Sequence, residues 1–274
     1  MMMMTMTMTN TPATVDRRGV VWFTLAGALT IAVVVWPAAI AGWSSGTHLS
    51  VAALPGAVAS GFAQWVGSGR TSSSPLAAAV SFWTVFHVVK AIVAVALLVV
   101  LVPVGQRVWT AFARARSRGR RVGLFLVGIL GAPIAPVVLL VVMANVQGAV
   151  APLSSVLNFL PMDGTSVLQV RGELASGTMT PPLAALIDDF RRYHAALVVT
   201  TVAALIVVVA GTAAIWVQRA RTPKADRRLR RVLAGGGILL PGMLLFLGIV
   251  LLANLSTVAD TAPALAAFFD GSGM

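Results

Sequence analysis

Five apolar runs of about 20 residues constrain this chain of 274 residues more than any other feature. An α-helix rises roughly 1.5 Å per residue, so about 20 residues cross the ~30 Å hydrocarbon core of a bilayer. Backbone groups in lipid must find partners within their own segment, and no stretch alternates as a barrel strand does. The sequence therefore predicts an all-α integral membrane protein, a bundle of five transmembrane helices over 20–43, 88–105, 122–146, 195–217 and 232–255.

The composition agrees with this class. Hydrophobic residues make up 58% of the chain and charged residues only 10%, whereas about 25% charged residues is usual in a soluble domain. The chain has no cysteine, which excludes disulfides, thiolate metal sites and cysteine nucleophiles. Arginine far outnumbers lysine, and with the Ala and Val content this indicates a GC-rich bacterial genome.

Basic residues gather in alternate connections between the spans. They precede the first span at Arg17 and Arg18, and they follow the second and fourth spans within 107–121 and 219–231. Short basic loops stay in the cytoplasm, so we expect a bacterial plasma membrane protein with a cytoplasmic N-terminus and an external C-terminus. The net charge of +12 then indicates contact with anionic lipid headgroups and not with nucleic acid.

The first span has a second interpretation. Arg17 and Arg18, the apolar run and the small residues Ala39 and Ala41 resemble a secretory signal with its cleavage site. The run exceeds the about 7–15 residues of a signal core, which favours a retained anchor. Residues 1–16, which begin with a Met and Thr repeat, are predicted to be a disordered leader.

The chain contains an internal repeat. Segment 75–78 recurs as 182–185, both reading Pro-Leu-Ala-Ala, and at the same spacing His87 matches His194 and Trp109 matches Trp216. With small gaps, Pro133 then matches Pro241 and Asn145 matches Asn254. We interpret this as a duplicated hairpin of two helices. Two spans return the chain to its starting side, so the copies are expected to be parallel, related by an axis along the membrane normal.

This duplication divides the chain into two and a half copies. The first hairpin covers 17–110 and has an external loop at 44–75. The second hairpin, 111–217, begins with a basic cytoplasmic loop and has an external loop at 147–182. The half repeat, 218–274, holds another basic loop, the fifth span and an external tail. Within the external loops, 49–66 and 153–160 are candidates for short helices on the membrane or over the bundle.

Several residues of the spans have structural interpretations. Trp109 and Trp216 are expected at the membrane interface as anchors. Pro133 and Pro241 predict helix kinks, which can also mark a hinge or an ion site. Glycines crowd the cytoplasmic halves of the third and fifth spans. Small residues permit close approach of helices, so we expect these two spans to pack together centrally.

A polar cluster is predicted where the second and fourth spans reach the outer surface. Its members are His87, Lys90, Asp188, Asp189, Arg192 and His194. In one interpretation the two histidines face each other and bind a metal, a headgroup phosphate or a proton. The other interpretation is favoured because the first repeat lacks the acids and arginines: interface histidines, a snorkelling lysine and an ion-paired helix start. Asn145, Gln147 and Asn254 are expected to hydrogen bond between helices, which is favoured over the alternative that they line a pathway.

The motifs of common enzymes are missing. The sequence has no Walker A, HExxH or GxSxG pattern, and we assign no catalytic residue, metal or cofactor. We therefore expect a non-enzymatic structural or accessory component of a cell-envelope membrane assembly, bound to a partner membrane protein or to further copies of itself. The alternative is a transporter or channel for a small solute, an ion or a lipid, gated at His87 and His194. An enzyme acting on outer-leaflet headgroups through Asp188, Asp189 and His194 is the third hypothesis.

Overall fold

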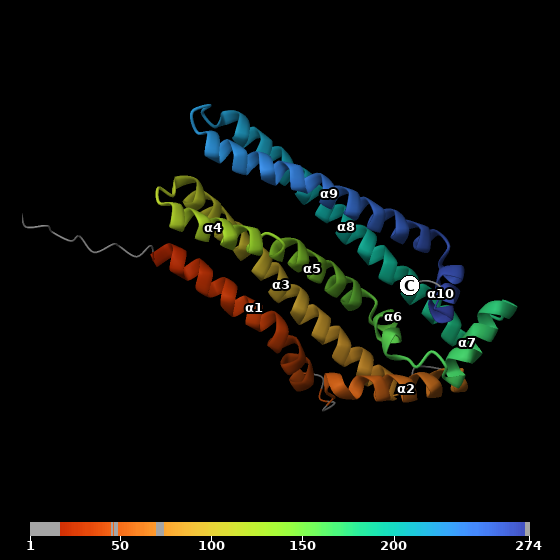
Figure 1. The fold of residues 1–274 in the computed structure, drawn as a ribbon. Helices are drawn as coiled ribbons and strands as arrows, with labels where there is room; N and C mark the ends of the chain where they lie inside the picture. The colour runs from red at the N-terminus through yellow and green to blue at the C-terminus, as the bar shows by residue number, and fades with distance from the viewer. Residues whose placement is uncertain (1–16, 45, 47–48, 70–73, 272–274) are drawn as a thin grey trace, which may run out of the picture.

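The computed structural model describes residues 17–44, 46, 49–69 and 74–271, and every regular element among them is a helix (Figure 1). The predicted leader at 1–16 lies outside the described residues. In chain order the elements are α1 (Arg17–Ser44), η1 (Val51–Ala53), α2 (Leu54–Ser68), α3 (Ser74–Arg114), α4 (Arg118–Gly131), α5 (Ile134–Val150), α6 (Pro152–Val156), η2 (Leu157–Phe159), α7 (Thr165–Ser176), α8 (Pro181–Arg221), α9 (Arg227–Ala259) and α10 (Thr261–Asp270).

Five helical stretches are long and apolar enough to cross a membrane. They are α1, α3, α4 together with α5, α8 and α9, so the five predicted apolar helices are confirmed. Two of them begin well before the apolar runs at 88 and 195, since α3 starts at Ser74 and α8 at Pro181. Thr180 caps the start of α8 by accepting a hydrogen bond from the Leu183 N–H at 3.3 Å.

The long helices pack in a row. Helix α1 packs on α3, α3 on α5, α5 on α8, and α8 on α9. The expectation that the third and fifth spans pack together centrally is therefore wrong, because α9 packs chiefly on α8 and ends the row. Two glycines of these spans instead pack against tryptophans of the preceding long helix. Gly128 lies against Trp109, and Gly237 lies against Trp216.

The best-packed part of the protein is a cap over one end of the row. We call α2, α6, η2, α7, α10 and the first turns of α3 and α8 the cap. Side chains from these elements form the largest buried apolar cluster, in which Phe62, Phe82, Leu183, Leu265 and Phe269 are almost fully buried. Fully burying a side chain of this size contributes about 1.5–3 kcal/mol, so this cluster holds the connecting segments against the long helices.

The chain predicted as an external tail belongs to this cap. Helix α10 docks between α7 and α8, and Arg171 of α7 forms an ion pair with Asp270 at 3.1 Å. Segment 165–176, which the sequence treats as loop, is helix α7, and the short helices expected at 49–66 and 153–160 correspond to α2 and to α6 with η2.

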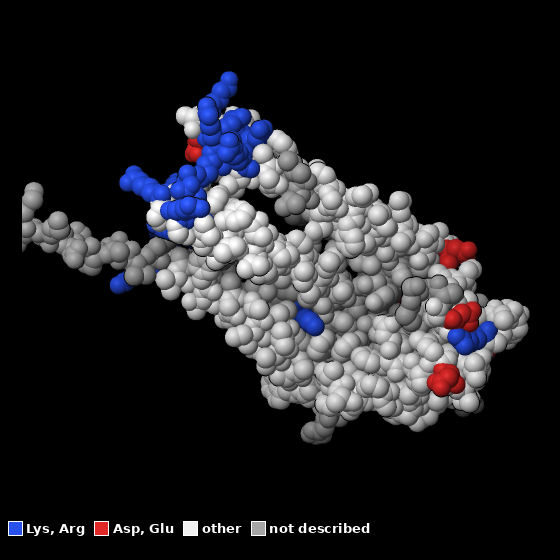
Figure 2. Space-filling view, viewed as in Figure 1, with Lys and Arg blue, Asp and Glu red and all other residues white. Residues whose placement is uncertain are grey.

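The two ends of the row differ in charge (Figure 2). Lysines and arginines gather at the end where α3 and α8 finish, which we call the basic end, while the acidic residues visible in this view lie mainly near the cap. Between the ends, apolar side chains point outward, including Ile31 (66% exposed), Leu130 (74%) and Val199 (68%). Such a surface suits hydrocarbon and not water.

Candidate functional site

The histidine of the first repeat is enclosed by helices α3, α5 and α6. His87 of α3 lies with its Nδ1 2.8 Å from Asn145 Oδ1 on α5 and its Nε2 3.1 Å from Ser155 Oγ on α6. Trp83, one turn before His87, donates its indole N–H to the same serine oxygen at 3.0 Å. Helix α6 turns back over the end of α5, and this turn brings the serine to the histidine.

These bonds fix the protonation of the His87 ring. The Asn145 amide Nδ2 donates to the Val141 carbonyl at 2.6 Å, so Oδ1 is the acceptor that faces the imidazole. His87 Nδ1 therefore carries the hydrogen, and Nε2 accepts from the Ser155 hydroxyl. The hydroxyl in turn accepts from Trp83. Both ring nitrogens of His87 thus have a partner when the imidazole is neutral.

The second histidine has the same partner type but fewer bonds. His194 of α8 lies with Nδ1 2.7 Å from Asn254 Oδ1 on α9. The Asn254 amide donates to the Val250 carbonyl at 2.8 Å, so His194 also carries its hydrogen on Nδ1. Its Nε2 makes no hydrogen bond with any residue that the structure describes. The expectation that the two asparagines hydrogen bond between helices is confirmed.

The remaining members of the predicted polar cluster are dispersed. Asp189 accepts a hydrogen bond from the Ser154 N–H at 2.7 Å, which joins α8 to α6. Asp188 pairs with Arg192 on the exposed side of α8, and Lys90 lies 5.1 Å from the centre of the Phe86 ring. An exposed ion pair one helical turn apart, such as Asp188 with Arg192, contributes about 0.3–0.5 kcal/mol to the free energy of unfolding.

The interpretation in which the two histidines face each other is wrong. Each ring bonds to an asparagine of the following long helix, because α3 packs on α5 and α8 packs on α9. Within the described residues, no group of three His, Cys, Asp or Glu side chains is placed to hold a metal ion.

The two repeated tryptophans lie at the opposite end of the same helix pairs. A Cβ at Gly128 would come within 2.9 Å of the Trp109 ring, and one at Gly237 within 2.9 Å of the Trp216 ring. Each tryptophan thus packs directly on a neighbouring helix backbone. A guanidinium also covers one of them, with Arg219 Cζ 5.2 Å from the centre of the Trp216 ring.

The two prolines predicted as kinks have different surroundings. Helix α4 ends at Gly131 and α5 begins at Ile134, so the third span is interrupted at Pro133. The Ala132 N–H still bonds the Gly128 carbonyl at 2.9 Å, which confines the interruption to one turn. Helix α9 is continuous through Pro241.

Sequence reasoning missed the arginines that cap helix ends. Arg228 of α9 donates to the carbonyls of Ala113 and Ala115, at 3.3 and 3.0 Å, where α3 ends. Arg230 does the same for α8, bonding the Arg219 and Thr222 carbonyls at 2.9 Å each. Cations at a helix C-terminus satisfy free carbonyls and oppose the helix dipole. Periodicity carries no signal for these contacts, since the arginines lie far along the chain or across a loop.

The serines of α6 were missed for a similar reason. Ser154 and Ser155 bond Asp189 and His87, which come from two different long helices. Only their position two and three residues after the proline at 152, in the first turn of a short helix, sets them apart in the sequence.

Comparisons with known protein families, with curated proteins and with solved structures each find no match.

Proposed function

We propose that this chain is a non-enzymatic membrane scaffold, a structural or accessory component of a cell-envelope membrane assembly in a bacterium. The observation that carries the proposal is the use of both histidines as links between helices. His87 and His194 were the best candidates for reactive groups, and each is bonded to an asparagine of the adjacent long helix. A neutral imidazole with both nitrogens engaged, as at His87, positions helices and is poorly suited to proton transfer.

A parallel repeat of two helices gives this scaffold its form. Three correspondences support the repeat: the bonds of His87 and His194 to asparagine, the packing of Trp109 and Trp216 on glycine, and the order in which α1, α3, α5, α8 and α9 contact one another. A fourth correspondence is the backbone conformation of the residue that directly follows α5 and of the residue that directly follows α9. Ala151, between α5 and α6, has φ −132° and ψ 71°, and Asp260, between α9 and α10, has φ −133° and ψ 73°.

The scaffold would present its cap on the outside of the plasma membrane. The charge asymmetry supports this orientation, because the connections rich in arginine favour the cytoplasm. The cap is then the part available to soluble or membrane-bound partners. The exposed apolar sides of α1 and α9, at the two ends of the row, are available to partner helices or to further copies of the chain.

The orientation can be tested cleanly because the chain has no cysteine. Gly119 on α4 and Gly172 on α7 are exposed glycines with open space where a side chain would go. Gly172→Cys is expected to react with a membrane-impermeant maleimide in intact cells, and Gly119→Cys only after lysis. Labelling of Gly119→Cys in intact cells, with Gly172→Cys protected, would reverse the topology.

The scaffold role is tested by cross-linking and by flux. The tagged full chain, cross-linked in its native membrane and purified in mild detergent, is expected to emerge with a fixed partner or as a defined oligomer. Emergence only as a monomer contradicts the role. The same protein in proteoliposomes is expected to show no proton or metal-ion flux that His87→Gln or His194→Gln abolishes. A flux that depends on these side chains would replace the scaffold by the transporter.

A further inference from the structure

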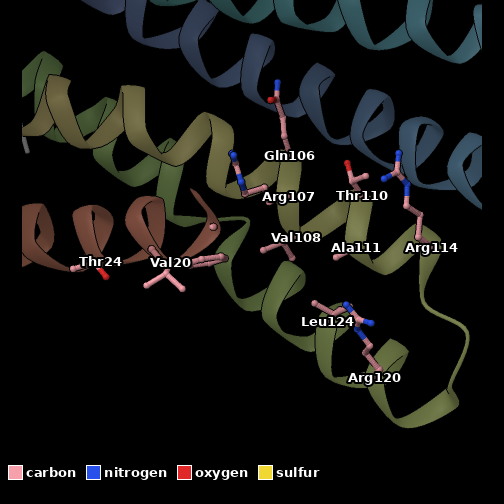
Figure 3. A pocket seen from close by; sticks show the side chains of 12 residues that line it. Val20, Thr24, Gln106, Arg107, Val108, Thr110, Ala111, Arg114, Arg120 and Leu124 are labelled. Carbon is pink, nitrogen blue, oxygen red and sulfur yellow. The ribbon is translucent and has the colours of Figure 1, made fainter. Parts of the chain in front are cut away.

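An open groove lies at the basic end, between α1, α3 and α4, with a volume of about 880 Å³ (Figure 3). Three arginines and several apolar side chains line it. Arg107 and Arg114 come from α3 and Arg120 from α4, and in Figure 3 Arg120 lies on one side of α3 while the side chains of Arg107 and Arg114 extend from the other. The apolar walls are Val20 and Phe23 of α1 and Leu124 of α4.

Among the residues that the structure describes, these arginines have no acidic partner. No lining residue is acidic, and neither of the ion pairs found in the described part of the chain involves this end. Arg107 is held in place, with its Cζ 5.9 Å from the centre of the Trp22 ring and its Nη1 donating to the Pro103 carbonyl at 3.5 Å. The side chains of Arg114 and Arg120 bond to nothing within the described residues and are exposed. Within the described part of the chain, the groove therefore carries positive charge that no acidic side chain balances.

The shape of the groove favours an amphiphile. Its walls continue into the apolar surfaces of α1 and α4, where Val20 and Phe23 are about half exposed, at 53% and 48%. A free anion would leave these walls in water, whereas a ligand with both a phosphate and an acyl chain would satisfy both parts. Guanidinium groups are well suited to phosphate because their N–H groups form paired bonds to its oxygens.

We propose that this groove binds one anionic phospholipid from the leaflet at the basic end. The phosphate binds at the basic mouth of the groove, paired with Arg120 of α4 and attracted by Arg107 and Arg114 of α3, and the acyl chains follow the apolar faces of α1 and α4. The inference rests on the membrane insertion that the proposed function requires, but it does not rest on a partner protein. A bound lipid would join the first helix to the rest of the row at the end distant from the cap.

A second basic hollow lacks the apolar part of this groove. It has a volume of about 230 Å³ and lies between the end of α8 and the start of α9. Its lining is almost entirely basic, and one of its arginines, Arg230, is already bonded to the carbonyls that end α8. It offers no apolar wall for an acyl chain.

The test compares two double variants that lose the same charge. Arg114→Gln with Arg120→Gln removes two groove arginines, while Arg116→Gln with Arg118→Gln removes two exposed arginines nearby that do not line the groove. Native mass spectrometry of the full chain measures binding of phosphatidylglycerol, with phosphatidylcholine as the neutral lipid. A basic residue at an anionic surface contributes ~1 kcal/mol, or about fivefold in affinity, so the groove variant is expected to bind phosphatidylglycerol about 30-fold more weakly and the control within about twofold.

Equal losses in both variants, or no loss in either, would overturn the proposal. Thermal unfolding of each variant in detergent shows that the fold is retained, and the wild-type protein must prefer phosphatidylglycerol to phosphatidylcholine. Phe23→Ala removes an apolar wall without changing charge and is expected to weaken phosphatidylglycerol binding. If inorganic phosphate displaces the lipid equally well at equal concentration, the groove is a free-anion site and the lipid assignment fails. A missing partner protein affects none of these measurements, so the scaffold role and the lipid site fail separately.

Discussion

Replacing each histidine by alanine is expected to have unequal effects, although the two residues occupy matching positions in the repeat. His87→Ala removes two hydrogen bonds, to Asn145 and Ser155, and leaves the buried asparagine oxygen without its donor. A neutral hydrogen bond contributes about 1 kcal/mol, and a buried unpaired polar group costs about 1–3 kcal/mol. His194→Ala removes one bond, to Asn254, and likewise leaves a buried asparagine oxygen without its donor, but it has no counterpart of the bond to Ser155.

The expected loss of unfolding free energy is therefore about 3 kcal/mol at His87 and about 2 kcal/mol at His194, the difference being the bond to Ser155. The aromatic contacts do not alter this difference, because each substitution removes a similar contact between ring centres. Trp83 lies 4.7 Å from the His87 ring, and Phe190 lies 4.6 Å from the His194 ring. Equilibrium unfolding in mixed micelles of mild detergent and dodecyl sulfate, followed by far-UV circular dichroism, measures both variants.

Double-mutant cycles separate the bond between each histidine and its asparagine from the other contacts. The two N···O distances are nearly equal, so the coupling of His87 with Asn145 and that of His194 with Asn254 are both expected at about 0.6–1.7 kcal/mol, the range found between membrane helices. Equal losses for the two single variants would refute the role of Ser155. Zero coupling in both cycles would show that the histidines do not join the helices.

Three further predictions use the same unfolding measurement. Gly148→Ala places a Cβ 2.5 Å from His87 Nε2 and is expected to destabilise the protein by about 1–3 kcal/mol; an unchanged stability would mean that the ring can move aside. Gly237→Ala places a Cβ 2.9 Å from the Trp216 ring and is expected to destabilise the protein. Gly235→Ala places a Cβ where nothing lies within 4 Å and is expected to stabilise α9 by up to about 1 kcal/mol. A similar effect of both changes would contradict the packing of Trp216 on Gly237. Ala264 lies four residues after Asp260, as Ser155 lies four residues after Ala151, and each backbone N–H bonds that carbonyl. Ala264→Ser is expected to raise the free energy of unfolding by about 1 kcal/mol through a bond to His194. This gain should vanish when His194 is replaced by alanine.

Some of the site could be predicted from the sequence and some could not. The repeated His and Asn positions were visible as matched residues, and bonding of the asparagines between helices followed from their polarity in apolar spans. The less favoured interpretation, in which His87 faces His194, is wrong because repeat symmetry relates two residues without bringing them together. Their distance depends on the order in which the helices pack, which hydropathy does not contain.

The sequence by itself determined the five apolar helices and the separation of basic from acidic residues. Both are local properties, since a run of about 20 apolar residues is helical and soluble in lipid whatever lies beside it. Only the tertiary structure decided that Trp109 and Trp216 pack on glycines, that Ser154 and Ser155 join α3 to α8, and that Arg228 caps a distant helix. Helix association inside lipid depends on close fit and on a few hydrogen bonds instead of hydrophobicity. Shape complementarity of this kind arises only when the helices are assembled.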